Sequence, residues 1–191
     1  MDYRIALVYS STQGQTKKIA ERIGGRLEEA GCSVEWINAG ELQHQLDLSV
    51  YDGVLVGSAI YAGRITRPIY RFVRHQLDGL RRLPTALFSV GMLAALESDQ
   101  EESTTDHIIS DFLGEMEWEP TMVESFAGAI PFTEYGFFRR WLMKWMVRRR
   151  TGEKIDASRD YEYTDWEQVD SFADRYLSRV REMAGSGKEA R

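Results

Sequence analysis

Apolar residues recur along the chain in two patterns, as short continuous runs and at the spacing of a helix. The continuous runs predict five strands, at residues 4–9, 33–37, 53–58, 85–91 and 122–129. Helical spacing predicts four helices, one ending near residue 30, one starting at residue 68, one covering about 105–115 and one starting near residue 164. Strands that alternate with helices predict an α/β fold, a three-layer, doubly wound parallel sheet of five strands.

The last helix and the segment before it set the expected domain limits. Thr164 is expected to cap this helix, and Glu167 to complete a capping box. An insertion over about residues 133–160 separates the fifth strand from the helix. We therefore expect one domain over residues 1–184, followed by a flexible tail over residues 185–191.

A run of small and polar residues, S-S-T-Q-G-Q-T, stands between the first strand and the first helix. Doubly wound sheets bind ligands at the carboxyl ends of their strands, and a helix N-terminus favours an anion. Hydroxyl groups can donate to such an anion, and glycine lets the backbone approach closely. The run predicts a phosphate cradle made of Ser10, Ser11, Thr12, Gln13, Gly14, Gln15 and Thr16. An ordinary polar turn is the alternative.

The cradle carries neither of the common nucleotide signatures. It lacks the lysine of a Walker A loop, and G-x-G-x-x-G is also absent. An uncharged, hydroxyl-rich loop suits a terminal phosphomonoester better than a magnesium-bound nucleotide.

Two further strand ends combine small residues with one or two apolar ones, in S-A-I-Y-A-G and S-V-G-M-L-A. Such loops suit the two sides of a flat ring. Tyr61 or Ile60 is expected to cover one ring face, and Met92 or Leu93 the other. The alternative is that these four side chains complete the core. The expected ring-binding residues are Ser58, Ala59, Ile60, Tyr61, Gly63, Ser89, Val90, Gly91, Met92 and Leu93.

Composition excludes several classes of protein. With 191 residues, 43% of them hydrophobic, the chain can bury a substantial core. A net charge of −6 argues against nucleic acid as a partner. Cys32 is the single cysteine and the three histidines stand far apart, so we expect no disulfide and no metal site. No signal peptide and no apolar run of about 20 residues is present, which predicts a cytoplasmic protein.

The phosphate loop, in V-Y-S-S-T-Q-G-Q-T, resembles that of flavodoxin-like proteins. Further segments resemble one branch of them, the menaquinone-dependent protoporphyrinogen dehydrogenases. These segments are D-G-V-L-V-G-S-A-I, L-P-T-A-L-F-S-V, A-G-A-I-P-F and Y-T-D-W-E-Q-V. The resemblance implies the strand order 2-1-3-4-5 and one noncovalent FMN. Its ring would lie between residues 58–63 and 89–94.

The resemblance also implies an activity. FMN would take electron pairs from a reduced tetrapyrrole, converting protoporphyrinogen IX to protoporphyrin IX in heme biosynthesis, and pass them to a respiratory quinone. No side chain stands out as a catalytic acid or base. Two alternatives stay open: a flavodoxin-type electron carrier, and a quinone reductase that takes electrons from a nicotinamide cofactor.

The insertion contains a basic, aromatic segment over residues 136–150. On a helical wheel one arc is apolar and the other carries cations, which is typical of a helix lying on an anionic membrane. We expect peripheral contact with the inner face of the cell membrane. The alternative is that the aromatic arc packs on this domain or on a second subunit. The apolar arc comprises Phe137, Phe138, Trp141, Leu142, Trp145 and Met146, and the cations are Arg139, Arg140, Lys144, Arg148, Arg149 and Arg150.

An acidic loop after the fourth strand argues against a tetrapyrrole substrate. It carries Glu97, Asp99, Glu101, Glu102 and Asp106 and no base. Beside the flavin, these carboxylates would repel the propionates of a tetrapyrrole. The alternative is a solvated loop that caps the next helix.

Overall fold

Five parallel strands form the centre of the computed structural model, which describes residues 2–91, 104–130 and 161–189. They pair in the order β2-β1-β3-β5-β6, which is 2-1-3-4-5 along the chain, as predicted. A short strand, β4 (Arg64–Ile65), pairs antiparallel with the end of β3. The five are β1 (Arg4–Ser10), β2 (Ser33–Asn38), β3 (Gly53–Tyr61), β5 (Thr85–Gly91) and β6 (Met122–Ala127).

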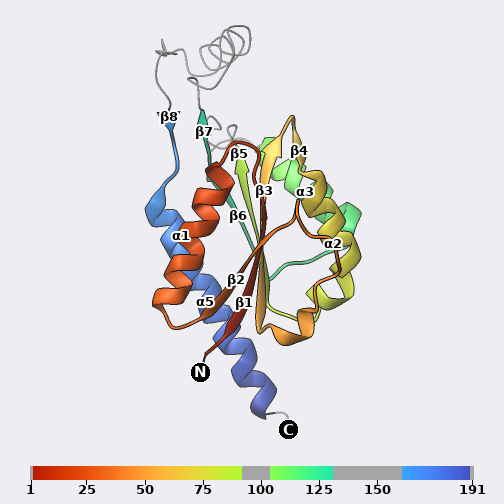
Figure 1. The fold of residues 1–191 in the computed structure, drawn as a ribbon, viewed down its shortest axis with the longest axis vertical. Coiled ribbons are helices and arrows are strands. Elements are labelled where there is room, and N and C mark those ends of the chain that lie inside the picture. The colour runs from red at the N-terminus through yellow and green to blue at the C-terminus, as the bar shows by residue number, and fades with distance from the viewer. Residues whose placement is uncertain (1, 92–103, 131–160, 190–191) are drawn as a thin grey trace, which may run out of the picture.

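Helices cover both faces of this sheet, so the predicted three layers are confirmed (Figure 1). One face is covered by α1 (Gln15–Glu29) and α5 (Trp166–Glu189), and the other by α2 (Arg67–Leu80) and α3 (Thr104–Met116). A short 3-10 turn, η1 (Leu48–Val50), precedes β3.

Alternation along β1 explains how both faces become apolar. Successive side chains of a strand point to opposite faces. Ile5 and Leu7 therefore pack with the residues of α1 and α5, whereas Ala6 and Val8 pack with those of α2 and α3. A strand buried on both faces needs a continuous apolar run, which is the pattern that predicted it.

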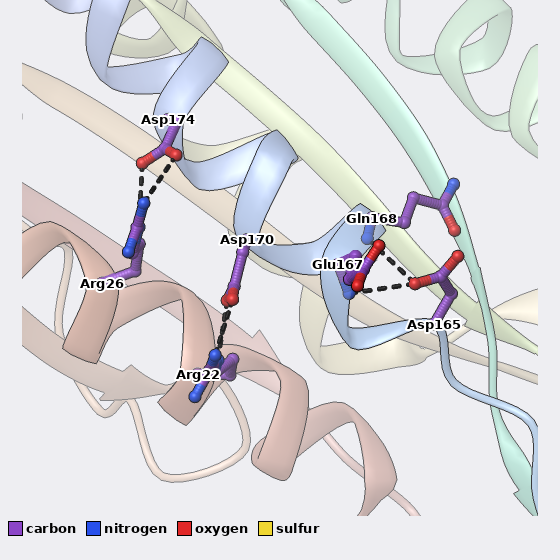
Figure 2. A network of polar contacts seen from close by, with 7 residues as sticks. All are labelled: Arg22, Arg26, Asp165, Glu167, Gln168, Asp170 and Asp174. Atoms are coloured by element: carbon purple, nitrogen blue, oxygen red, sulfur yellow. Dashed lines mark hydrogen bonds and ion pairs between the residues drawn. The ribbon is translucent and has the colours of Figure 1, made fainter.

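The start of α5 differs from the prediction. Asp165, not Thr164, caps the helix: its Oδ1 accepts hydrogen bonds from the backbone N–H groups of Glu167 (2.9 Å) and Gln168 (3.1 Å) (Figure 2). The helix begins one residue later than the capping box required, because the Thr164 hydroxyl donates instead to the carbonyl of Ala127 (2.7 Å).

The end of α5 also differs, since the helix continues through residues 185–189, which the sequence placed in the tail. Glycines in this stretch disfavour a helix by about 1 kcal/mol each but do not stop it.

The insertion leaves the fold through a two-stranded stem. β7 (Ala129–Ile130) pairs antiparallel with β8 (Tyr161–Glu162) beyond the carboxyl ends of the sheet (Figure 1). The predicted fifth strand is thus interrupted at Gly128, whose N–H donates to the carbonyl of Gly91 (3.1 Å). The predicted amphipathic segment at 136–150 and acidic residues 97–102 lie outside the described residues. Within the described ranges, no helix is both long enough and apolar enough to cross a bilayer.

Two ion pairs join the helices on the first face. The guanidinium of Arg22 donates to both carboxylate oxygens of Asp170, at 2.6 Å each, and Arg26 does the same to Asp174, at 3.0 and 2.9 Å (Figure 2). The spacing is four residues on both helices, so the pairs lie one turn apart.

Candidate functional site

The first strand ends in the predicted phosphate loop, and Gly14 shapes its exit into α1. Gly14 has φ +87°, in the left-handed region that glycine adopts without strain. Its carbonyl accepts the N–H of Lys18 (3.0 Å), and its own N–H donates to the hydroxyl of Ser11 (3.0 Å). The turn therefore starts the helix, whose first N–H groups have no helical carbonyl to bind.

The charges around this helix start favour an anion. The first turn of α1 carries no acidic residue, and Lys17 and Lys18 lie in it. Both lysines are paired with carboxylates, Glu21 and Glu162, so the partial positive charge of the helix N-terminus is the main attraction for an anion. Ser10 and Thr16 are buried on either side, whereas Thr12 is exposed. This arrangement fits the terminal phosphate of FMN.

Gln15 is tied to the start of the last helix. Its side-chain amide donates to the hydroxyl of Thr164 (2.8 Å), which donates in turn to the carbonyl of Ala127. Its predicted contact with the cofactor is therefore left to its backbone N–H. Gln13 is exposed at the tip of the loop.

The second predicted loop, residues 58–63, is a tight hairpin. β3 continues to Tyr61 and pairs with β4, so Ile60 faces Ile65 and Tyr61 faces Arg64. Ala62 (φ +50°) and Gly63 (φ +72°) form the turn, as expected for a two-residue hairpin with positive φ at both central positions. Sequence reasoning missed this hairpin because Ala-Gly is a weaker turn signal than Asn-Gly.

The hairpin gives different environments to Ile60 and Tyr61, the two residues predicted as alternatives for covering one face of the ring. Ile60 packs against the core shared with α2 and α3. Tyr61 is 49% exposed, at the tip beside the carboxyl edge of the sheet.

Ser58 and Ser89 lie side by side in the sheet and are fully buried. The Ser58 hydroxyl donates to the carbonyl of Ala59 (2.9 Å) and accepts the N–H of Thr66 (3.1 Å). The Ser89 hydroxyl donates to that of Ser125 (3.2 Å). The Ser58 hydroxyl thus binds the start of α2, and the Ser89 hydroxyl joins β5 to β6. Both are engaged within the protein, which leaves backbone groups for a ligand.

The strand register places this second part of the site next to the first. Ser10 is aligned with Ser58, and Ser58 with Ser89, on adjacent strands. Val90 is buried, and Gly91 lies next to Ile60. Met92 and Leu93 lie outside the described residues.

Thr66 and Thr164 were missed as residues that support the site. Thr66 precedes a helix with proline in its first turn, a start signal that identifies the cap position but not the bond to Ser58. Thr164 was assigned to the wrong role, because the sequence does not reveal its contact with Gln15.

Comparisons with known proteins agree with this geometry. The family model "Flavodoxin domain" matches residues 6–158. The chain is 32% identical to a protoporphyrinogen IX dehydrogenase [quinone] of Leishmania major, over 90% of this chain and 74% of that protein. It is 28% identical to the protein of that name in Escherichia coli K12, over 87% of this chain and 91% of that protein. These two relatives confirm the resemblance inferred from the sequence segments.

Solved structures with the same fold include flavodoxins. A short-chain flavodoxin associated with a PDU bacterial microcompartment has a TM-score of 0.57 at 13% identity, covering 93% of this chain and 99% of that one. A Streptococcus pneumoniae flavodoxin has a TM-score of 0.56 at 16% identity, covering 92% and 99%. The family match, the fold and the anion-favouring loop agree on the same cofactor. The chain belongs to the flavodoxin-domain family and is an FMN-dependent oxidoreductase.

Proposed function

We propose that the chain oxidises protoporphyrinogen IX to protoporphyrin IX and passes the electrons to a respiratory quinone. The observation that carries this proposal is the site's position: an anion cradle and two strand ends meet at one edge of the sheet, in a chain related to enzymes of that name.

The phosphate of FMN is assigned to residues 10–16. Backbone N–H groups of Gln15 and Thr16, with the hydroxyls of Ser10 and Thr12, would surround it. Lys17 and Lys18 lie nearby, each paired with a carboxylate, Lys17 with Glu21 (3.7 Å) and Lys18 with Glu162 (3.6 Å). No acidic side chain in the first turn of α1 opposes a dianion.

The ring of FMN is assigned to the space between residues 58–63 and 89–94. The exposed side chain of Tyr61 supports the assignment of this residue to one ring face, because aromatic rings stack on one another. Backbone groups of Ala59 and Gly91 would border the ring edge.

Bound FMN supplies two-electron redox chemistry, and several rounds convert the porphyrinogen to the porphyrin. This chain's residues bind and orient the cofactor and keep water from one of its faces. We assign no catalytic acid or base.

The residues at 136–150 are proposed to bind an anionic membrane, where a lipid-dissolved quinone is available. Replacing Arg148, Arg149 and Arg150 by Glu is expected to reduce co-sedimentation with anionic vesicles and leave the weak binding to neutral vesicles as it is. Unchanged binding to anionic vesicles would contradict electrostatic attachment.

A flavodoxin-type electron carrier is the second candidate function. The net charge of −6 favours it, because carriers dock protein partners through complementary charge. A carrier would exchange electrons with a redox protein and would not oxidise a porphyrinogen directly.

One anaerobic assay separates the two. FMN-loaded protein is mixed with protoporphyrinogen IX and a menaquinone analogue, and porphyrin fluorescence is followed. We expect porphyrin to form well above the rate of the flavin-free protein and to require the quinone for multiple turnovers. A rate equal to that of the flavin-free control would remove the proposed activity.

A further inference from the structure

A pocket of about 350 Å³ lies between α2 and the segment that follows β2. Figure 1 shows this orange segment running from β2 to the face of the sheet that α2 covers. The side-chain amide of Gln76 on α2 donates to the carbonyl of Leu46 (2.7 Å), which fixes the segment to the helix. The pocket is lined by Ala39, Gly40, Leu42, Gln43, His44, Gln45, Pro68, Arg71, Phe72, His75 and Gln76.

The chemistry of this lining differs from that of the chain as a whole. It combines one arginine, two histidines and three glutamines, and none of these described residues is acidic. Phe72 is buried and Leu42 half-buried, so they provide an apolar floor. An apolar floor below cationic and amide donors fits a short aliphatic arm that ends in a carboxylate.

The guanidinium of Arg71 is available to bind a carboxylate. In the part of the chain that the structure describes, no carboxylate pairs with Arg71, which is exposed. Two acidic residues of the segment are engaged locally: Glu41 accepts the amide of Asn38 (2.7 Å), and Asp47 accepts Ser49 (3.0 Å from its N–H). Arginine holds its charge at all physiological pH values and binds carboxylates through two parallel donors.

Two hydrogen bonds place the lining of the pocket near the candidate FMN site. Ala39 donates its N–H to the carbonyl of Tyr9 (2.8 Å), one residue before the start of the phosphate loop at Ser10. Pro68 lies two residues after Thr66, whose N–H binds Ser58. The rim therefore lies beside the ends of both β1 and β3, next to the proposed cofactor.

We propose that this pocket binds a propionate arm of the tetrapyrrole and so orients the macrocycle toward the flavin. The inference rests on the proposed function for its substrate class. It also gives the carboxylates of the substrate a cation to bind, Arg71, whereas the acidic residues at 97–106 would repel them.

Binding of the product tests the pocket without turnover. The FMN-loaded full chain is titrated with protoporphyrin IX and with its dimethyl ester, both in the same detergent micelles, and fluorescence is followed. We expect the dicarboxylate to bind roughly tenfold more tightly than the ester, the size of one charge-assisted contact. Equal affinity for the two would overturn the proposal.

Arg71→Glu and Arg74→Glu form a matched pair. Both residues are exposed on α2 and both substitutions change the charge equally, but only Arg71 lines the pocket. Arg71→Glu is expected to weaken binding of the dicarboxylate by about tenfold or more, and Arg74→Glu by about twofold. Equal losses of affinity in the two variants would overturn the proposal, because they would show that the dicarboxylate binds a diffuse basic surface and not the pocket.

Two further measurements complete the test. Arg71→Gln, which removes the charge without reversing it, should show most of the loss, and FMN content checks that each variant is folded. Turnover of protoporphyrinogen IX is then compared. If the wild-type chain is active and Arg71→Glu keeps its kcat/KM, the pocket is wrong and the function stands. If the wild-type chain is inactive but binds the dicarboxylate more tightly than the ester, the proposed activity is wrong. The proposal that the pocket binds a propionate is then kept.

Discussion

Two glycines, one just before α1 and one in its C-terminal half, have different reasons to be glycine. Gly14 has φ +87°, whereas Gly25 lies within the helix. A methyl group added at either would meet no heavy atom within 4 Å. An added Cβ therefore has room at both positions, and the two glycines differ only in their backbone conformation.

Gly14→Ala is expected to destabilise the fold by about 1–2 kcal/mol, because a Cβ is strained in the left-handed region. Gly25→Ala should stabilise it by about 0.5–1 kcal/mol, because alanine favours the helix. Urea unfolding measures both. FMN affinity should fall in Gly14→Ala only, since the altered turn moves the N–H groups of α1. Equal unfolding midpoints for the two variants would show that the turn at Gly14 is relaxed.

The sequence predicts the chemistry of a site when its residues are neighbours along the chain. The small, uncharged composition of residues 10–16 indicated an anion site, and the structure adds a helix start without acidic residues. The partners of Ser58, Ser89 and Thr164 were not predictable, since they come from residues 8, 36 and 37 positions away. Hydroxyls that looked free in the sequence are engaged in the fold.

At the scale of elements, α1 and α5 are joined across their seam by Arg22–Asp170 and Arg26–Asp174 (Figure 2). Hydrogen bonds from Arg22 hold the pKa of Asp170 below its usual range, and those from Arg26 do the same for Asp174. These pairs are partly exposed, so water and salt weaken them.

Because the folded pKa values of the two carboxyls are lowered, their contribution to stability is present above the unfolded pKa of about 4 and is lost as the pH falls through the folded values. Asp170→Asn with Asp174→Asn should therefore unfold at lower urea concentration than the wild-type chain at pH 7. The gap should be constant down to about pH 5 and close below about pH 4.

Asp78→Asn is the control for a lost negative charge, because Asp78 is exposed on α2 and far from this seam along the chain. It should leave the pH dependence of the urea midpoint unchanged. A gap between the wild-type chain and the double variant that is as large at pH 3 as at pH 7 would contradict the ion-pair explanation.

The elements themselves were largely predictable, and the errors have physical causes. Continuous apolar runs located all five parallel strands, because burial on both faces requires them. β3 extends three residues beyond its predicted end at residue 58, because β4 supplies a partner that the apolar pattern does not reveal. The apolar pattern does not reveal β7 and β8 either, because their pairing joins residues on either side of the insertion.

At the scale of the whole molecule, the strand order brings the carboxyl ends of β1, β3 and β5 to one edge of the sheet. The strand order switches direction between the neighbours β1 and β3, and doubly wound sheets bind ligands at such a point. The order itself followed from the family resemblance, since apolar runs do not specify which strands are neighbours. The insertion stem rises from the same edge (Figure 1). The proposed cofactor site, the proposed propionate pocket and the insertion stem would thus lie around one end of the sheet.

We propose that the loop at residues 10–16 binds the phosphate of FMN. The most direct test is a titration of the flavin-free protein with FMN and with riboflavin, which lacks the phosphate, followed by flavin fluorescence. Several charge-assisted hydrogen bonds predict that FMN binds at least about 100-fold more tightly. Thr12→Glu should abolish most of this preference through charge repulsion. Thr12→Gln, which is similar in size to Glu but neutral, should lose only the contribution of the Thr12 hydroxyl. Equal affinity of the wild-type chain for riboflavin and FMN would contradict the account.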